Sequence, residues 1–233
     1  MNELVISDFL EQSLSVPNLE EQRKIGNFLK QLDALITLHQ RKLEKLKIVK
    51  KSLLEKMFPK NGEKIPELRF KGFTDAWEQC ALGSIAEITM GQSPRGETYS
   101  TSPSKYILVQ GNADIKNGWV VPRIWTTEKT KLISKGDILM SVRAPVGSVG
   151  QTRFDAVIGR GIAGIKGDGF IFQVLSKMDS LSYWKNKSCG STFESINSNE
   201  IKSAELIMPT KCERNKIGCF FTKLDTLITL HQR

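Results

Sequence analysis

A long heptad pattern of apolar residues dominates the early part of the chain. From Glu20 to Met57 the sequence contains no proline and only one glycine, Gly26. Apolar residues recur there in alternating steps of four and three, the repeat of a helix that buries one stripe against another helix. At about 1.5 Å per residue, the predicted helix is on the order of 57 Å long. We expect its pairing seam to consist of Ile25, Leu29, Leu32, Ile36, Leu43, Leu46, Leu53 and Met57.

The pattern changes between residues 65 and 209, where short β-type runs alternate with glycine-rich turns. One helical stretch, roughly Phe170 to Lys187, interrupts these runs. The alternation predicts an α+β fold class, a mixed domain with many short strands, combined with long coiled-coil helices. The runs that we expect to form strands are SIAEIT, KYILVQ, GWVVP, GDILMSV, SVGQT and GIAGI.

The start of the long helix is repeated near the end of the chain. Residues 209–233 match residues 17–41 at fifteen of 25 positions, and the final LITLHQR is identical in both segments. A period of about 190 residues is too long for a solenoid, so it indicates duplication of a domain together with its helix. The regions that we expect are 1–16, the tail of a preceding unit; 17–60, a spacer helix; 65–209, a recognition domain; and 210–233, the truncated start of a second spacer helix.

The charge of the chain narrows the class of partner. The 34 Lys and Arg residues outnumber the 25 Asp and Glu residues, which gives a formal net charge of +9. A surplus of this size favours a polyanionic partner. The four cysteines lack the spacing of a zinc site, and no stretch reaches the roughly 20 apolar residues of a membrane span. We therefore expect a cytoplasmic protein that binds no membrane, no metal and no cofactor.

Two short motifs resemble catalytic sites but lack necessary residues. Residues 91–98 have the spacing of a phosphate-binding loop, yet Glu97 stands where the phosphate-binding lysine belongs. Asp114 and Lys116 form the D-x-K pattern of many nucleases without a convincing metal-binding partner before it. The Asn/Asp-Pro-Pro-aromatic tetrapeptide of adenine methyltransferases is absent from the sequence. We therefore expect no catalytic residues in this chain.

Polar, glycine-flanked loops in the β-rich region carry the side chains that suit DNA. Arg, Gln and Asn can make two-point contacts with base edges, whereas Lys, Ser and Thr suit phosphates. Ordinary solvated loops would have a similar composition, so this pattern alone leaves both interpretations open. The residues that we expect to contact DNA are Gln92, Ser93, Arg95, Lys105, Gln110, Asn112, Lys116, Arg143, Arg160, Lys187, Ser191 and Thr192.

Several of these segments resemble the DNA-specificity subunit of type I restriction-modification enzymes. The run from Trp77 to Pro94 is similar to the opening of that family's target recognition domain, W-x(n)-L-G-x-I-A-E-I-x-x-G-x-[ST]-P. Gly136 to Gly147 resembles its central G-D-I-L-x-S segment, and Gly190 to Pro209 resembles its closing G-S-T segment. Residues 17–22 match the P-x-L-x-E-Q start of its conserved helix, although the second copy lacks the E-Q pair.

The resemblance implies a non-catalytic subunit that works inside a larger enzyme. In that family two recognition domains lie at the ends of an antiparallel helix pair, and each reads one half of a split double-stranded DNA site. The helices also dock modification subunits, which methylate adenine, and restriction subunits join through these. For this chain the resemblance implies a half-subunit or partial subunit that forms a homodimer or pairs with another specificity chain.

Two other classes of function remain as alternatives. A stand-alone nuclease or methyltransferase would require the catalytic motifs that the sequence lacks. A coiled-coil oligomerisation protein with no role on DNA would use the same helix seam. The salt dependence of DNA binding separates the alternatives, because phosphate contacts weaken steeply with salt.

Overall fold

The computed structural model describes residues 10–60, 62–187 and 195–232. The chain divides into two compact units, residues 1–46 and residues 47–233. The second unit contains the whole β-rich region, and the last part of the long helix and the whole of the second helix copy fold with it. The predicted fold class, α+β with many short strands and a long helix, is confirmed.

The heptad pattern forms one continuous helix, α2 (Leu19–Lys56), whose ends each lie one residue from those of the Glu20–Met57 pattern. Asn18 caps its start, because the Asn18 side chain accepts a hydrogen bond from the Glu21 backbone N–H at 2.9 Å. Soon after its end, Pro59 removes a backbone donor that a continuing helix would need. Within residues 10–46, the apolar side chains of α2 are partly or largely exposed.

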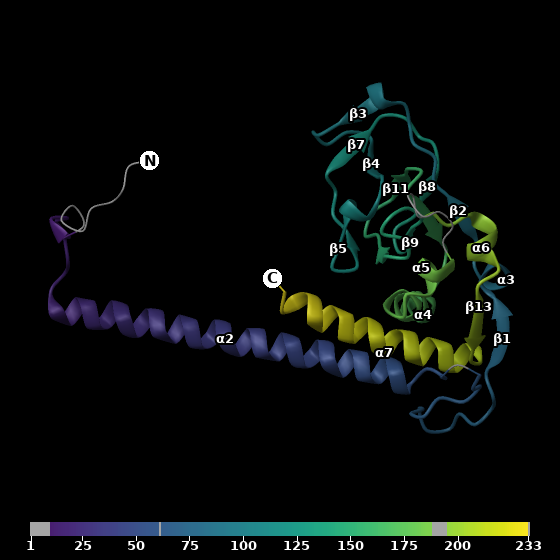
Figure 1. The fold of residues 1–233 in the computed structure, drawn as a ribbon, viewed down its shortest axis with the longest axis horizontal. Helices are drawn as coiled ribbons and strands as arrows, with labels where there is room; N and C mark the ends of the chain where they lie inside the picture. The colour runs from purple at the N-terminus through teal and green to yellow at the C-terminus, as the bar shows by residue number, and fades with distance from the viewer. Residues whose placement is uncertain (1–9, 61, 188–194, 233) are drawn as a thin grey trace. The chain divides into compact units, whose positions relative to one another are not determined.

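The described residues of the second unit form three sheets (Figure 1). A six-stranded sheet runs in the order β2-β12-β9-β10-β6-β5, a five-stranded sheet in the order β3-β7-β4-β11-β8, and β1 pairs antiparallel with β13. The bounds are β1 Glu78–Ala81, β2 Ile88–Met90, β3 Tyr99–Ser100, β4 Tyr106–Val109, β5 Ile115–Lys116, β6 Trp119–Val120, β7 Ile124–Thr126, β8 Leu132–Ile133, β9 Ile138–Ser141, β10 Val149–Gln151, β11 Ala156–Ile158, β12 Ile162–Ile165 and β13 Glu205–Met208.

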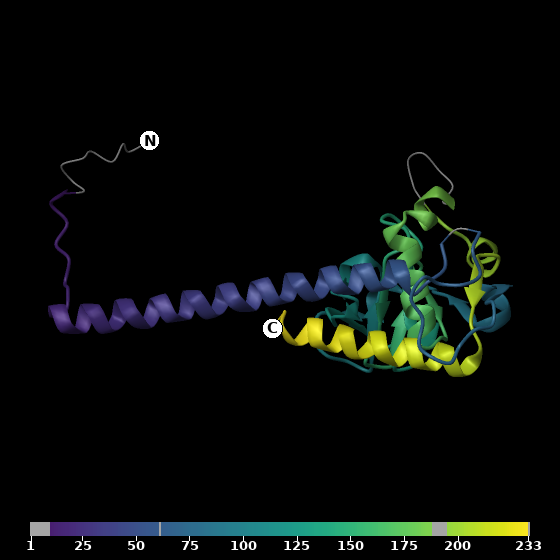
Figure 2. The same ribbon diagram turned by 90° about the horizontal axis from the view of Figure 1, so that it is seen from below.

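Helices pack against the six-stranded sheet and against β1. Helix α4 contacts both β10 and α7, so it lies between the six-stranded sheet and α7, which runs along the lower surface of the unit (Figures 1 and 2). The fully buried side chains of Trp77, Phe170 and Phe221 meet in this layer. The helices of the unit are α3 Leu82–Ile85, α4 Gly169–Ser180, α5 Tyr183–Lys187, α6 Ser198–Lys202 and α7 Lys211–Leu230, with short 3-10 turns at Gly96–Thr98 and Asn112–Asp114.

Two sequence-based expectations are wrong in detail. The run SIAEIT does not form one strand, because Ser84 and Ile85 end helix α3 and only Ile88 and Thr89 enter β2. The helix expected from Phe170 to Lys187 is split into α4 and α5. Ser182 has a backbone φ of 57°, the left-handed conformation that ends a helix. In the described ranges no helix is long and apolar enough to cross a membrane.

Candidate nucleic-acid interface

Loops from four places in the chain meet around one hollow of about 300 Å³. They follow the carboxyl ends of β2, β4 and β9 or connect β11 to β12. The hollow thereby collects five of the side chains that the sequence marked as DNA contacts. The residues that line it are Ser93, Gln110, Gly111, Asn112, Ser141, Arg143, Ala144, Arg160 and Gly161.

Glycines allow these loops to approach one another closely. A Cβ atom on Gly161 would lie 2.3 Å from the Gln110 carbonyl oxygen. A Cβ atom on Gly91 would lie 2.1 Å from the Gly159 carbonyl oxygen. Both distances are far below van der Waals contact, so any larger residue would push the loops apart. The turn Gly159–Arg160–Gly161 therefore places Arg160 at the rim of the hollow.

A buried carboxylate anchors the loop that carries Gln110 and Asn112. The Asp114 side chain accepts hydrogen bonds from the Gln110 N–H at 2.8 Å and the Gly111 N–H at 3.3 Å. Its other oxygen accepts from Arg123 Nε at 2.8 Å. Asp114 is 2% exposed, so the first residue of the D-x-K pattern holds a loop and does not face a substrate. The sequence alone did not reveal this role.

Hydrogen bonds also fix the backbone at both arginines. The Ser93 hydroxyl accepts the Arg160 N–H at 3.2 Å, and the Ser141 hydroxyl donates to the Arg143 carbonyl at 2.8 Å. Ser141 is a contributor that the loop composition did not indicate. Arg143 also forms a β-bridge with Ser195. Both arginine side chains are exposed, and within residues 10–60, 62–187 and 195–232 neither guanidinium forms an ion pair.

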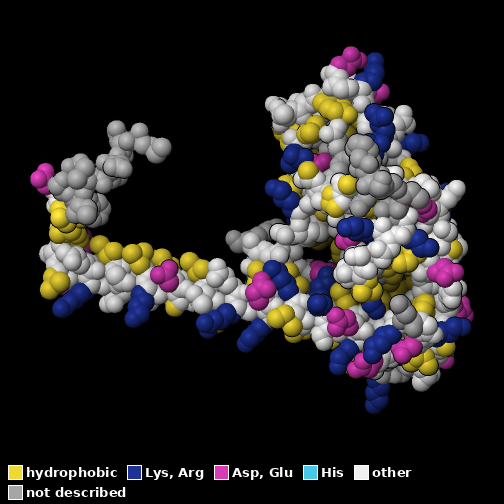
Figure 3. Space-filling model, viewed as in Figure 1, with side chains coloured by type: hydrophobic (Ala, Val, Ile, Leu, Met, Phe, Trp, Pro, Cys, Tyr) yellow, Lys and Arg dark blue, Asp and Glu magenta, His cyan; other side chains and the backbone are white. Residues whose placement is uncertain are grey.

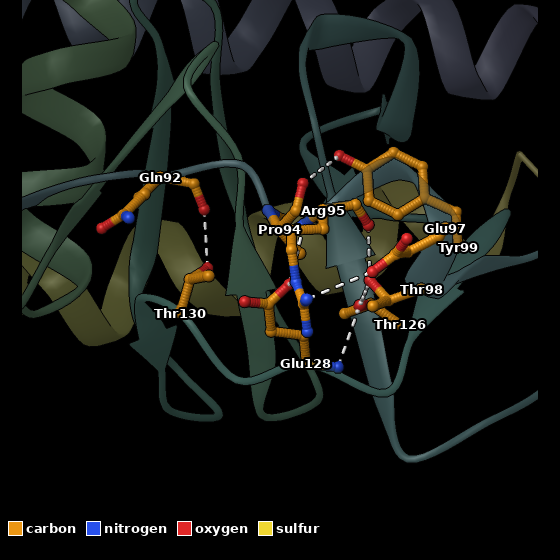
Figure 4. Close-up of polar contacts among 9 residues, drawn as sticks. All are labelled: Gln92, Pro94, Arg95, Glu97, Thr98, Tyr99, Thr126, Glu128 and Thr130. Carbon is orange, nitrogen blue, oxygen red and sulfur yellow. Dashed lines mark hydrogen bonds and ion pairs between the residues drawn. The ribbon is translucent and has the colours of Figure 1, made fainter.

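Arg95 and Gln92 lie outside this group. The Arg95 guanidinium lies 3.2 Å from Glu97 and 3.6 Å from Glu128, so two carboxylates balance its charge (Figure 4). The Arg95 backbone N–H also donates to Glu128 at 2.7 Å. Gln92 is exposed, and its backbone carbonyl oxygen accepts a hydrogen bond from the Thr130 hydroxyl at 2.6 Å. Neither residue lines the hollow.

The expected phosphate contacts are spread over the surface of the unit. Lys116 is exposed on β5. Lys105 Nζ lies 5.4 Å from the centre of the Tyr106 ring, and Lys187 Nζ lies 5.9 Å from that of Tyr183. Both lysines are exposed and free to extend toward a polyanion. Ser191 and Thr192 lie outside the described residues.

The expected helix seam divides into exposed and buried parts. Ile25, Leu29, Leu32 and Ile36 are 38–54% exposed, and Leu43 and Leu46 are partly buried. Leu53 packs against the core of the second unit. The prediction that Met57 belongs to the pairing seam is wrong. Met57 follows the end of α2 and is only 4% exposed inside that same core. Its heptad position reflects packing within the chain and not pairing between chains.

A larger cavity of about 780 Å³ lies elsewhere in the second unit, beside α4, α7 and the end of α2. Burial raises the pKa of Asp179 and lowers the pKa of Lys177 at its wall. Apolar side chains such as Trp119, Phe172 and Leu54 line much of the cavity. Across the described part of the chain, no group of three His, Cys, Asp or Glu side chains could hold a metal ion. The smaller hollow remains the better candidate for binding, because Arg, Gln and Asn side chains, which are able to contact base edges, converge there.

Sequence comparison finds one family model and a relative that match nearly the whole chain. The profile of the family described as "Type I restriction modification DNA specificity domain" matches residues 1–48 and 74–233. A relative from Methanocaldococcus jannaschii, named as a specificity subunit of the type I restriction enzyme MjaX, is 31% identical over 229 residues. The match covers 94% of this chain and 54% of the relative.

Solved structures of type I restriction-modification proteins also resemble this chain. A chain from structural work on complex assembly and conformational transition of the type I R-M system superposes with a TM-score of 0.66 and 27% identity. The HsdS subunit from Thermoanaerobacter tengcongensis superposes with a TM-score of 0.63 and 25% identity. These matches cover 92% and 94% of this chain, and 54% of each solved chain. The chain thus spans about half the length of the proteins that it resembles.

Proposed function

The chain belongs to the type I restriction modification DNA specificity family, and from that membership we propose that it reads one half of a bipartite double-stranded DNA site. The observation that carries the proposal is the convergence of Ser93, Gln110, Asn112, Arg143 and Arg160 on one hollow. The chain catalyses no reaction itself. It determines the DNA sequence at which the modification subunits methylate adenine.

The chemistry of the hollow suits base edges in the major groove. A guanidinium can donate two hydrogen bonds to O6 and N7 of guanine, and a Gln or Asn amide can pair with N6 and N7 of adenine. The residues that line the hollow include no Asp or Glu, so Arg143 and Arg160 bring positive charge that the wall does not offset. We therefore expect the half-site to contain at least one G·C pair and one A·T pair. Exposed lysines elsewhere on the unit contribute phosphate contacts that carry no sequence information.

Variants of three arginines test this assignment. Arg143→Ala and Arg160→Ala should each weaken binding to the cognate duplex by about 1–3 kcal/mol and leave binding to random duplex nearly unchanged. Arg95→Ala is the matched control, because Glu97 and Glu128 already pair with Arg95. Fluorescence anisotropy at fixed salt measures each affinity. An equal loss of affinity for cognate and random DNA would show that the two arginines contact phosphates and not bases.

Salt dependence separates phosphate contacts from base contacts. Lys116→Ala should weaken binding to all sequences alike and lower the slope of log K against log salt by roughly one unit. A chain with no measurable DNA affinity at low salt would instead favour the helical oligomerisation alternative.

We further propose that α2 joins the chain to its partners. Its apolar residues pair with a spacer helix of another specificity chain, in a homodimer or with a different chain, and the spacer helices dock the modification subunits. The proposal is supported by the 46% exposed Ile25 and 53% exposed Leu29, because such a stripe is stable in water only when covered. The restriction subunits join the assembly through the modification subunits.

A further inference from the structure

Arg143 lies in a short closed loop between β9 and β10. The Ser141 carbonyl oxygen accepts a hydrogen bond from the Gly147 N–H at 2.9 Å, and the Ser141 N–H donates to the Ser148 carbonyl at 2.8 Å. These two bonds join the ends of the loop. Because the loop is short and closed, a displacement at one end moves the residues at the other.

Backbone hydrogen bonds place the end of the loop that carries Arg143. The Val142 N–H donates to the Gly161 carbonyl at 2.9 Å, and the Val142 carbonyl accepts from the Ile196 N–H at 3.1 Å. Val142 and Ile196 are each 3% exposed. The residue directly before Arg143 is therefore fixed between two neighbouring segments of the domain.

Side-chain packing places the other end of the loop. Gly147 has a backbone φ of 99°, a left-handed conformation that favours glycine. A Cβ atom on Gly147 would lie 2.8 Å from Trp184 Cβ and 2.9 Å from Asp179 Oδ1. Both distances are below van der Waals contact, so the loop backbone rests directly on these two side chains.

Trp184 and Asp179 belong to the turn that joins α4 to α5, which we call the α4–α5 corner (residues 179–184). The Ser182 N–H donates to the Asp179 carbonyl at 2.8 Å, and the φ of 57° at Ser182 ends α4 there. The ring of Tyr183 packs edge-to-face on that of Trp184, with centroids 5.0 Å apart. Trp184 itself is 0% exposed, so the corner presents a rigid surface to the loop.

The tryptophan brings a polar group that its surroundings do not satisfy. Within the described residues, the buried Trp184 Nε1–H has no hydrogen-bond partner. A buried donor without a partner is costly, and a purely apolar core residue would avoid that cost. Trp184 shares its core cluster with Val142, Val146 and Ile196, so its ring supports both ends of the Arg143 loop.

Charge alone would not distinguish one DNA sequence from another. In Figure 3, Lys and Arg side chains are interspersed with Asp and Glu side chains over the visible face of the second unit. Attraction to phosphate carries no sequence information. Discrimination requires a guanidinium that reaches O6 and N7 of guanine, and a binding group must be held within about 0.5 Å of its working position.

We propose that Trp184 and Asp179 are positioning residues for Arg143. They support Gly147 and thereby set where the Arg143 loop lies at the rim of the hollow, although neither of the two side chains lines the hollow. A change at the α4–α5 corner should alter discrimination between base pairs without removing a group that touches DNA. The inference rests on the proposed function, in which Arg143 reads a base.

Two glycines with nearly the same backbone conformation give a matched test in the full chain. Gly147→Ala adds a methyl group that meets the α4–α5 corner. Gly136 has a φ of 96°, and a Cβ atom there would meet nothing within 4 Å. Both substitutions place an alanine in the left-handed region, so both introduce similar backbone strain. A difference between the two variants therefore reports the contact with the corner.

The DNA affinities of these variants should differ. Gly147→Ala should weaken binding to the cognate duplex by about 5- to 150-fold, the range expected when Arg143→Ala removes a base contact. Gly136→Ala should change that affinity by less than about twofold, and neither variant should change binding to random duplex by more. An equal effect of the two alanines on cognate binding overturns the proposal.

Proteolysis reports the position of the loop without DNA. Trypsin cleaves after Arg143 only when the loop opens, and mass spectrometry identifies the cut. This cleavage should be at least about tenfold faster in Gly147→Ala than in Gly136→Ala. Equal rates also overturn the proposal. If Arg143→Ala leaves cognate binding intact, the proposed function is at fault, and the cleavage rates still decide whether the corner holds the loop.

Variants of the tryptophan test the same contact from the other side. Trp184→Phe retains a Cβ atom and a ring edge next to Gly147, so cognate affinity should stay within about twofold of the original. Trp184→Ala should lower it by about fivefold or more. The double variant with Arg143→Ala should bind no more weakly than Arg143→Ala alone, because both changes remove the same base contact. Additive losses would contradict the proposal.

Trp77→Ala is the control for lost stability. Trp77 is 1% exposed and, within the described residues, also has a buried indole N–H without a partner, but its ring packs on Phe58 and Phe170. It should lose stability as Trp184→Ala does and keep its preference for cognate DNA. An equal loss of that preference in both variants overturns the positioning role. Circular dichroism shows which variants are folded, and the pair of glycine variants decides the question if Trp184→Ala is not.

Discussion

The carboxylate of Asp114 holds together the loop that presents Gln110 and Asn112. It accepts two backbone N–H groups and pairs with Arg123 while remaining 2% exposed. Each of these bonds crosses from one part of the loop to another, so the side chain fixes the shape of one wall of the hollow. Its neighbour in the short D-x-K pattern, Lys116, is exposed and has no comparable structural contact in the described ranges.

Asp114→Ala should lower the free energy of unfolding by about 2–4 kcal/mol, because it leaves backbone donors and Arg123 without their acceptor. Lys116→Ala should change it by less than about 0.5 kcal/mol. Urea denaturation measures both values. With Mg²⁺ present, neither the original chain nor the two variants should cleave DNA. Cleavage by the original chain that both substitutions abolish would instead support the nuclease interpretation.

Asp179 should make the free energy of unfolding fall as the pH rises, which is the opposite of the usual effect of a carboxylate. Burial raises its pKa above the ordinary value of about 3.9. Between that ordinary value and the raised one, the folded state binds more protons than the unfolded state, so stability falls as pH rises. Asp179→Asn should therefore be more stable than the original chain at pH 7, and the difference should vanish near pH 3.

Glu55→Gln removes a charge from the wall of the same cavity and serves as the control in these melts. Thermal unfolding of the three proteins from pH 3 to pH 8 gives the comparison. A benefit of Asp179→Asn that is constant across this range would mean that the carboxylate charge is not the cause.

The arginines show why only part of the site could be predicted. Glycine-flanked loops indicated Arg143 and Arg160, and both residues line the hollow, while their contact with DNA stays a prediction. The same composition indicated Arg95, yet Glu128, 33 residues away in the sequence, pairs with it. Ion pairs between distant residues depend on the fold, and loop composition contains no information about them.

At the level of elements, periodicity predicted long helices better than short strands. The α2 heptads extend over 38 residues, and each repeat adds to the signal. Strands β7, β8 and β11 have three, two and three residues, too few to display alternation, and none was among the predicted runs. For Met57 the heptad pattern extended too far, because this core residue lies after the end of the helix but happens to continue the repeat.

The middle of α2 gives the sharpest test of helix pairing. Leu43→Asp or Leu46→Asp places a charge on the seam and should shift an assembled chain to the monomer at micromolar concentration. Ile48→Asp is the matched control, since Ile48 is 66% exposed and lies off the seam. Light scattering reports the mass of each. A chain that is already monomeric, or an equal effect of all three changes, would exclude pairing through this seam.

For the whole molecule, the symmetry of the assembly determines the symmetry of the DNA site. Two identical chains related by a two-fold axis read identical half-sites, so a homodimer should direct methylation to an interrupted palindrome. Pairing with a different specificity chain should give two unlike half-sites. Methylation sequencing of DNA from cells that express this chain with modification subunits distinguishes the two assemblies.

The hollow is assembled from loops at residues 93, 110–112, 141–144 and 160–161, which are distant in sequence and held together by close glycine contacts. Grafting one loop from a relative would therefore disturb the other three, and retargeting by loop exchange should fail. The identical LITLHQR segments at residues 35–41 and 227–233 offer a better splice point. Under the proposed function, a crossover inside them should transfer the complete recognition domain and leave the helix uninterrupted, so we expect exchange of intact domains to change the DNA specificity.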